Sequence, residues 1–263
     1  MTKKIINALS IVKDLELFNK EPLYFAGGTA LSHYLKHRIS EDLDIISPEK
    51  LNYRAIKSTM FSLGAKFIQD KNATALRLAG MFPDEEMLKF DLEGVKVEFF
   101  HAVHPSQIKI FKSMTFSTYE ESKLKIIDIN SLAKLKIKAF VDRSKGRDVF
   151  DFTEILKNEI VNVEDIIDVF NFHNKADSLE AVENFIKAIN QPVVDEAVYL
   201  TEENPINIKY DDLKKDLIES FTAFKVNHLY SQIDSEAELI RQNINVYKTK
   251  IMQHPTTSSD ITH

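Results

Sequence analysis

The sequence contains no cysteine, so disulfide bridges and thiolate metal sites are excluded. It has no apolar run of membrane-spanning length. Its first apolar stretch, residues 5–12, is followed at once by charged residues and lacks a signal-peptide core and cleavage site. Motifs of the G-x-S-x-G and Walker-type GK[ST] kinds are absent, which leaves a hydrolase or a P-loop enzyme without support. We therefore expect a soluble, cytoplasmic protein without a membrane partner.

Charge is unevenly distributed along a chain of otherwise ordinary globular composition. The 263 residues are 28% charged and 44% hydrophobic, with a net charge of −6, which suits one large domain or two small ones. Residues 109–147 carry ten basic and four acidic side chains, a local net charge of +6. This segment could steer a polyanion to one face, or its lysines could be solvated and face different ways.

Two adjacent glycines, Gly27 and Gly28, stand between a predicted strand at residues 23–26 and a predicted helix at residues 29–37. Glycine lets the backbone approach a phosphate closely, and a helix N-terminus offers unpaired N–H groups to an anion. The segment therefore predicts a phosphate-binding turn. The alternative is an ordinary strand–turn–helix connection, in which the glycines serve the turn and Thr29 caps the helix.

Asp42 and Asp44 lie two residues apart within an apolar run. Alternate side chains of a strand share a face, so the two carboxylates converge while Leu43 and Ile45 point to the other side. Like charges at such spacing are costly unless a cation offsets them. Mg²⁺ prefers a few carboxylate oxygens, with water and substrate phosphate in its remaining positions. The pair predicts a magnesium site, with solvent-facing aspartates as the alternative.

A third carboxylate, Glu98, is predicted on a strand at residues 95–100 that follows a hairpin turn at Glu93–Gly94. If this strand neighbours the one with the two aspartates, Glu98 would complete the metal site and activate an attacking hydroxyl. Asp91 is the second choice for that role. For Glu98 the alternative is an ion pair with a lysine such as Lys96 on an edge strand.

A helix is predicted from a cap at Asn130 or Ser131 to about residue 142. Lys136 and Arg143 fall on its largely apolar face. Cations on an inward face need an anionic partner, and a nucleotide phosphate is a good candidate. The alternative is that the aliphatic stems pack while the charges return to water.

Four motifs follow one another in fixed order: GGTAL at residues 27–31, H-R-x-S-x-D-L-D at 37–44, K-x-x-A-F-x-x-R at 136–143 and R-D-x-x-D at 147–151. Together they resemble the AbiEii/AbiGii toxin-like nucleotidyltransferases, within the DNA polymerase β-like superfamily. The resemblance implies an α+β fold, with a nucleotidyltransferase-type mixed sheet flanked by helices and followed by an all-helical C-terminal domain.

The activity implied by the resemblance is Mg²⁺-dependent transfer of a nucleoside monophosphate from an NTP to an acceptor hydroxyl. The acceptor class is RNA, with tRNA 3′ ends the acceptors of some members. Such proteins are toxins of toxin–antitoxin or abortive-infection systems, which implies a cognate antitoxin as a partner.

The resemblance also implies residue roles. Asp42, Asp44 and Glu98 would hold Mg²⁺, and Lys136 would neutralise the charge that develops during transfer. Lys136 is chosen over the neighbouring lysines because of its spacing to Arg143. The nucleotide-binding set comprises Gly27, Gly28, Thr29, Ser40, Arg143, Lys145 and Arg147.

Two aspartates of the R-D-x-x-D motif receive separate predictions. Asp148 would orient Lys136 or take a proton, with an N-cap for a helix at residues 149–156 as its alternative. Asp151, one turn further on, is expected to do no more than pair with Arg147.

Most of the remaining chain is predicted to be helical. They are predicted at residues 2–19, 53–63, 163–172, 178–189, 210–229 and 235–252, with a strand at 73–80 and a polar break at 202–205. The predicted domains are a nucleotidyltransferase core (1–127), a helical domain that contributes Lys, Arg and Asp to the cleft (128–253) and a flexible tail (254–263). His33 and His37 have the spacing of a metal pair, but no third ligand is evident, so zinc is not predicted.

Two other functions share part of this pattern. A small-molecule nucleotidyltransferase of the antibiotic-modifying kind has the same front motif, but it would need an acidic pocket for a cationic acceptor, and the basic stretch at residues 109–147 disfavours that. A catalytically silent module that binds RNA or protein through its helical half is the second alternative.

Overall fold

The computed structural model describes residues 1–69, 71, 73–200 and 208–253, with side chains as far as residue 245. By compactness the chain divides into two units, Met1–Phe221 and Thr222–His263. The predicted polar break at 202–205 and tail at 254–263 lie outside the described residues. The predicted boundary at residue 128 falls inside the first unit, where the sheet gives way to helices.

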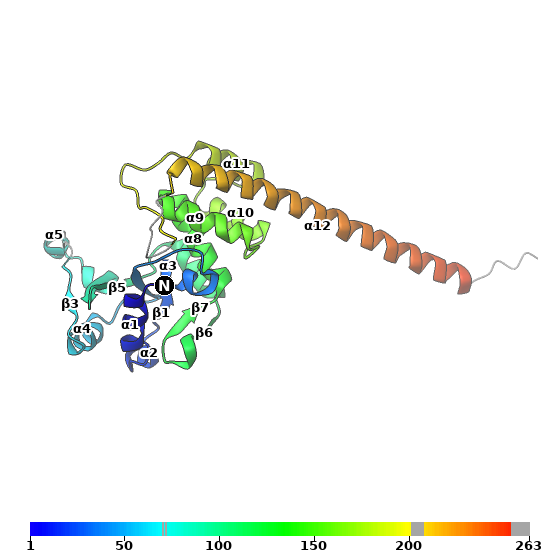
Figure 1. Ribbon diagram of the computed structural model, residues 1–263. Helices are drawn as coiled ribbons and strands as arrows, with labels where there is room; N and C mark the ends of the chain where they lie inside the picture. Colours follow the sequence, from blue (N-terminus) through cyan, green and yellow to red (C-terminus); the bar gives the residue numbers. More distant parts are fainter. Residues whose placement is uncertain (70, 72, 201–207, 254–263) are drawn as a thin grey trace, which may run out of the picture. The chain divides into compact units, whose positions relative to one another are not determined.

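A seven-stranded mixed sheet, in the order β3-β4-β5-β2-β1-β7-β6, forms the centre of the first unit (Figure 1). Its strands are β1 Tyr24–Ala26, β2 Asp42–Ser47, β3 Lys66–Phe67, β4 Met87–Leu92, β5 Val95–His101, β6 Phe116–Thr118 and β7 Lys125–Ile127. β2 is central, with β1 antiparallel on one side and β5 parallel on the other. Apolar side chains alternate along these strands, and Phe25, Leu43 and Phe99 are buried in the core.

Helices precede, interrupt and follow the sheet. The front half contains α1 Lys3–Val12, α2 Leu17–Lys20, α3 Gly27–Leu35, α4 Tyr53–Ser62, α5 Ala73–Leu78, α6 Pro83–Glu86, α7 Pro105–Ser113 and the 3-10 turn η1 Tyr119–Glu121. The rear half contains α8 Ile129–Arg143, α9 Gly146–Lys157, α10 Val163–Phe172, α11 Leu179–Ala188 and α12 Tyr210–Gln253. The α+β class with a helical C-terminal region is confirmed.

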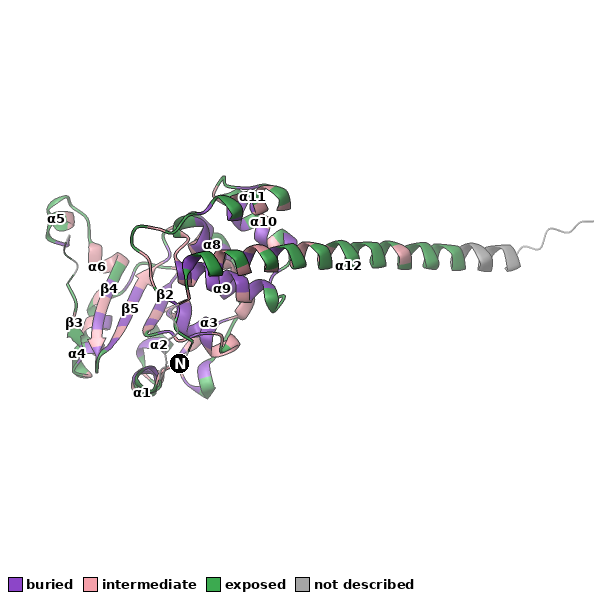
Figure 2. Ribbon diagram, turned by 45° about the horizontal axis from the view of Figure 1, so that its top comes forward, coloured by how far each residue is buried: buried purple, intermediate pink, exposed green. Residues whose placement is uncertain are grey.

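Helix α8 joins the sheet to the helical region. It packs against α3 on one side and against α9 and α10 on the other, and Figure 2 shows buried residues along it. Phe140 of α8 lies 5.1 Å from Phe152 of α9 and 5.9 Å from Phe185 of α11 between ring centroids. This aromatic cluster fixes α8, and with it the residues that α8 directs toward the sheet.

Several predicted elements differ from the structure. The stretch predicted as a strand at 73–80 is helix α5, since its alanines and leucines are strong helix formers and only an apparent alternation favoured a strand. The helices predicted at 210–229 and 235–252 are one helix, α12. Asp128, not Asn130 or Ser131, caps α8, and its side chain accepts from the Ser131 backbone N–H.

Candidate active site

Strand pairing brings three carboxylates to one face of the sheet. β2 and β5 run parallel in a register that places Asp44 beside Glu98 and Asp42 beside Lys96. Because side chains alternate, Asp42, Asp44 and Glu98 all point away from the buried Leu43 and Val97. The predicted neighbourhood of the two strands is confirmed.

Asp44 is the most electrostatically strained of the three. Loss of solvent raises its pKa to about 6, the negative charges of Glu98 and Asp42 act in the same direction, and the positive charge of Lys136 opposes them. A carboxylate in this setting gains from a nearby cation, because the cation offsets both the desolvation and the repulsion.

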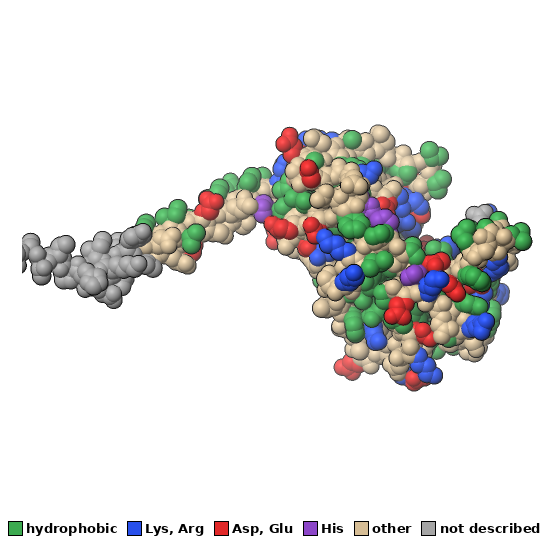
Figure 3. All heavy atoms as spheres, turned by 180° about the vertical axis from the view of Figure 1, so that it is seen from behind, with side chains coloured by type: hydrophobic (Ala, Val, Ile, Leu, Met, Phe, Trp, Pro, Cys, Tyr) green, Lys and Arg blue, Asp and Glu red, His purple; other side chains and the backbone are tan. Residues whose placement is uncertain are grey.

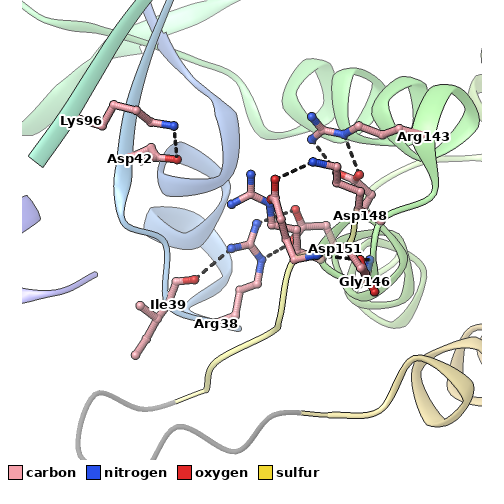
Figure 4. Close-up of polar contacts among 12 residues, drawn as sticks. Arg38, Ile39, Asp42, Lys96, Arg143, Gly146, Asp148 and Asp151 are labelled. Carbon is pink, nitrogen blue, oxygen red and sulfur yellow. Dashed lines mark hydrogen bonds and ion pairs between the residues drawn. The ribbon is translucent and has the colours of Figure 1, made fainter. Parts of the chain in front are cut away.

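The other two carboxylates already contact lysines. Lys96 Nζ lies 3.1 Å from an oxygen of Asp42 and 3.5 Å from an oxygen of Glu98, and Lys89 Nζ lies 2.9 Å from the other oxygen of Glu98. Figure 4 shows the pair between Lys96 and Asp42. Nowhere in the part of the chain that the structure describes do three metal-ligating side chains enclose a common point. Mg²⁺ nevertheless accepts a few carboxylate oxygens as donors when water and substrate phosphate fill its remaining positions, and Asp42 and Asp44 could supply them.

The absence of side chains at Gly27 and Gly28 lets polar side chains of the site lie close to the backbone there. Gly27 has φ +72°, and a Cβ on it would lie 1.9 Å from Asp44 Oδ2, so any side chain would displace that carboxylate. A Cβ on Gly28 would lie 2.8 Å from Arg38 Nη2 and 3.0 Å from Ser40 Oγ. The pair thus lets α3 begin against the carboxylates and cations of the site.

Thr29 takes a structural position. Its side chain is fully buried, and its hydroxyl donates to the backbone carbonyl of Asp42. The alternative, in which Thr29 is an N-cap, is wrong, because α3 begins at Gly27 with Ala26 as its cap. The hydrogen bond from Thr29 therefore links the first turn of α3 to the start of β2.

A buried ion-pair cluster fixes the lysine that faces the carboxylates. Asp151 of α9 is fully buried and accepts from Arg38 Nε at 2.6 Å and Arg38 Nη2 at 2.9 Å (Figure 4). Lys136 Nζ lies 2.9 Å from the same carboxylate, and His37 Nε2 lies 2.8 Å from it. Although burial opposes ionisation, the charges of Arg38 and Lys136 hold the pKa of Asp151 well below its ordinary value.

This cluster corrects two predictions. Asp151 does not pair with Arg147, and Asp151 rather than Asp148 holds Lys136. Sequence reasoning also missed Arg38, whose only signal was its place in the H-R-x-S-x-D-L-D motif. Its partner lies more than a hundred residues away in the chain, so spacing alone could not reveal the contact.

Asp148 has a different partner. Both of its oxygens accept from Arg143, at 2.8 Å from Nε and 2.9 Å from Nη2, in a bidentate pair that Figure 4 shows. The alternative N-cap role of Asp148 is wrong as well, since α9 begins earlier, at Gly146. The Gly146 N–H instead donates to Asp195 at 2.7 Å.

Two predicted phosphate ligands are held by one glutamate. Glu196 pairs with Lys145 at 2.6 Å and with Arg147, and these cations lower its pKa against the effect of burial. Arg147 borders the cleft, whereas Lys145 does not. A nucleotide phosphate at Arg147 would therefore compete with Glu196.

Most of the predicted site residues meet in one cleft of ≈ 330 Å³, whereas Thr29, Lys145 and Asp148 do not border it. Both carboxylates and cations line it, and Asp142 lies among the cations, paired with Lys138. From the predicted set it contains Gly27, Gly28, Ser40, Asp42, Asp44, Glu98, Lys136, Arg143 and Arg147, and it adds Arg38 and Lys138. A second cavity of ≈ 410 Å³ beside α5 and α6 contains none of the predicted catalytic residues. The first cleft is therefore the candidate active site.

The basic stretch at residues 109–147 is not one basic face. Lys109 pairs with Asp168, Lys123 with Glu16 and Lys134 with Asp165. The basic side chains from this stretch that border the cleft come from α8 and the first turn of α9: Lys136, Lys138, Arg143 and Arg147.

His33 and His37 do not form a metal pair. His33 packs on the ring of Tyr119 at 4.9 Å between centroids, while His37 contacts Asp151. Over the described ranges, no helix combines the length and the apolar content needed to cross a bilayer.

Three comparisons place this chain among known proteins. A search of curated protein sequences finds no match. Among solved structures, the chain is similar to JHP933 from Helicobacter pylori, with a TM-score of 0.49 and 17% identity over 91% of this chain and 99% of that one. It is also similar to the nucleotidyltransferase toxin MenT4 from Mycobacterium tuberculosis, with a TM-score of 0.43 and 14% identity over 82% of this chain and 79% of that one.

A third solved structure is the Thermotoga maritima CCA-adding enzyme complexed with tRNA, with a TM-score of 0.36 and 13% identity over 71% of this chain and 51% of that one. The chain also matches the model of a protein family. The model of the nucleotidyl transferase AbiEii toxin family, from type IV toxin–antitoxin systems, matches residues 12–239. The chain therefore belongs to the AbiEii family of nucleotidyltransferase toxins.

Proposed function

We propose that this nucleotidyltransferase uses Mg²⁺ to move a nucleoside monophosphate from an NTP to a hydroxyl group of RNA, with the tRNA 3′ end as acceptor. It acts as a toxin that a cognate antitoxin restrains. The observation that carries the proposal is the convergence of Asp42, Asp44 and Glu98 opposite Lys136 in a single cleft.

The donor set fits a magnesium ion. Asp42 and Asp44 would supply carboxylate oxygens, and the pKa of Asp44 is raised chiefly by burial, a cost that a bound cation would offset. Glu98, the register partner of Asp44, would complete the set once Lys89 and Lys96, which pair with its two oxygens, turn away. When bound, the ion would neutralise charge on the phosphates and polarise the α-phosphorus for attack.

The chain's own groups account for the rest of the transfer. The acceptor hydroxyl oxygen bonds to the α-phosphorus, the bond from that phosphorus to the β-bridging oxygen breaks, and pyrophosphate leaves. Glu98 takes the hydroxyl proton. Lys136 and Arg38, held in place by Asp151, face the negative charge that develops on the phosphates.

An RNA acceptor is supported by the cations along the cleft. Lys138, Arg143 and Arg147 border it beyond Lys136, and each is paired with a carboxylate, that of Asp142, Asp148 or Glu196. A polyanionic strand would contact these cations by taking the place of their carboxylate partners.

The test is incubation of the protein with each labelled NTP, Mg²⁺ and total RNA. Label in tRNA supports the proposal, and chelation of the metal should remove it. Label only in a small acceptor would instead indicate an antibiotic-type enzyme. No label with any NTP would indicate a silent binding module. Asp44→Asn is the negative control, because it keeps the size of the side chain and removes its charge.

A further inference from the structure

Helix α12 carries an exposed apolar stripe that the proposed chemistry does not use. We define the α12 stripe as Val226, Tyr230, Ile233, Ala237, Ile240 and Ile244. These positions alternate steps of four and three residues, and the sequence continues the alternation at Tyr247 and Ile251. A strict repeat of this kind averages 3.5 residues per turn, which is the period of a two-helix supercoil rather than of a single helix on a protein surface.

The large side chains of the stripe are open to solvent. The exposed fractions are 43% for Val226, 64% for Tyr230, 60% for Ile233, 58% for Ile240 and 47% for Ile244. Figure 3 shows hydrophobic side chains following one another along this helix. Exposed apolar side chains in a continuous row mark an interaction surface, whereas isolated ones do not.

We propose that the α12 stripe pairs with the same stripe of a second copy of this chain. A partner helix must repeat apolar residues at the same spacing over the same length, and a second copy does so with the same residues, in a self-complementary contact. The proposal does not depend on the reaction in the cleft.

Charge beside the stripe fits this occupant. Arg241 flanks Ile240, while Asp234 and Glu236 flank Ile233 and Ala237. In a parallel pair the heptad positions set Arg241 beside Glu236 of the second copy. In an antiparallel pair they set it beside Asp234 of the second copy. Either direction joins opposite charges twice, once for each copy.

The mass of the full-length protein tests the proposal. Sedimentation equilibrium over a concentration series should give twice the 30.2 kDa mass of one chain. Ile240→Asp should raise the dissociation constant at least about 100-fold, because it places two carboxylates in the apolar seam. Leu239→Asp is the matched control. Leu239 has a similar exposed fraction, 59%, but lies outside the stripe, so its variant should remain a dimer.

Circular dichroism of each variant should show unchanged helix content. A wild-type monomer throughout the series would overturn the proposal, and so would an equal loss of dimer in the two variants. A larger oligomer that Ile240→Asp dissolves but Leu239→Asp does not would support the same surface, because β-branched residues in the seam also favour higher orders.

The absence of cysteine permits a direct test of the contact. Under mild oxidation Ala237→Cys should cross-link to itself in a parallel pair or to Ile240→Cys of the second copy in an antiparallel pair. Either product supports the proposal. Cross-linking no faster than that of Leu239→Cys in both cases would overturn it.

Discussion

Asp44 and Glu98 are register partners on parallel strands, yet only Glu98 forms ion pairs with lysine side chains, those of Lys89 and Lys96. Asp44 carries a pKa of about 6. Asp44, a buried carboxylate without a lysine ion pair of its own, therefore lies in the candidate active site with its ionised form disfavoured, which leads to the first prediction.

Asp44→Asn should reduce nucleotide transfer by at least about 10²–10³-fold, the usual cost of removing one preorganised charged group from such a site. The fold should persist, because the substitution removes a charge that the folded protein holds at a cost. Initial rates with labelled NTP and thermal melting check both parts. Asp91→Asn is the control, since Asp91 lies on β4 and accepts from the Gly94 N–H in the hairpin. Equal rates for Asp44→Asn and wild type would remove Asp44 from the reaction.

Gly27→Ala should abolish transfer by displacing Asp44, because the added Cβ would lie 1.9 Å from Asp44 Oδ2. Gly64→Ala is a matched control. Gly64 has a similar φ of +78°, but nothing lies within 4 Å of its added Cβ. Both variants carry a backbone cost of about 1–2 kcal/mol at a positive φ, and Gly27→Ala adds the clash with Asp44. The melting temperature of Gly27→Ala should therefore fall at least as far as that of Gly64→Ala, while only Gly27→Ala should lose activity. Full activity in Gly27→Ala would contradict the close approach.

Metal binding should weaken in acid. Folding raises the pKa of Asp44 from 3.8 to about 6, so the folded protein holds this proton more tightly than the unfolded chain does. Metal-free stability should therefore decline as pH rises from the ordinary value to about 6, then become independent of this group. Mg²⁺ needs the ionised form, so its affinity should drop about tenfold per pH unit below that pKa.

The measurement is the gain in melting temperature on adding Mg²⁺, about one pH unit above and one below the pKa of Asp44. The gain should be larger at the higher pH, and Asp44→Asn should lose the difference. Equal gains in the wild-type protein would speak against competition between proton and metal at this carboxylate.

Asp151→Asn should lower the free energy of unfolding by about 3–5 kcal/mol, because it leaves Arg38 and Lys136 buried without their counter-charge. Folding lowers the pKa of Asp151, so this stabilisation is present above its ordinary value of 3.8 and is lost as pH falls toward the folded value. Urea unfolding near neutral pH and in acid measures both effects.

Asp168→Asn is the comparison for that variant. It removes an exposed partner of Lys109 and should cost no more than about 1 kcal/mol. If the two variants lost similar stability, the buried cluster would not hold the helical region to the sheet as described.

Local patterns predicted the parts of the site that depend on local geometry. The two-residue period placed Asp42 and Asp44 on one face, and the Glu93–Gly94 turn, with φ values of 53° and 80°, forms the predicted hairpin. The helix predicted at 163–172 has the same bounds as α10. In each case the residues that form the sequence pattern lie within a few positions of the structural feature that the pattern predicts.

Ion pairs between residues far apart in the sequence could not be predicted from local patterns. Arg38 and Asp151 meet across the sheet–helix junction, and Glu196 reaches Lys145 and Arg147 from a later segment. Neither contact follows from a period or a spacing. The sequence predicted helices at 210–229 and 235–252, and the intervening residues 230–234 were missed, through which α12 continues without a break.

Lys96 and Lys89 give the acidic strands an internal charge balance. The sheet could therefore fold without a bound metal ion, since Lys89 and Lys96 supply positive charge to Asp42 and Glu98. Binding of a divalent ion would then require these lysine ammonium groups to move into solvent. Folding of the protein and activation of its site would be two separate steps.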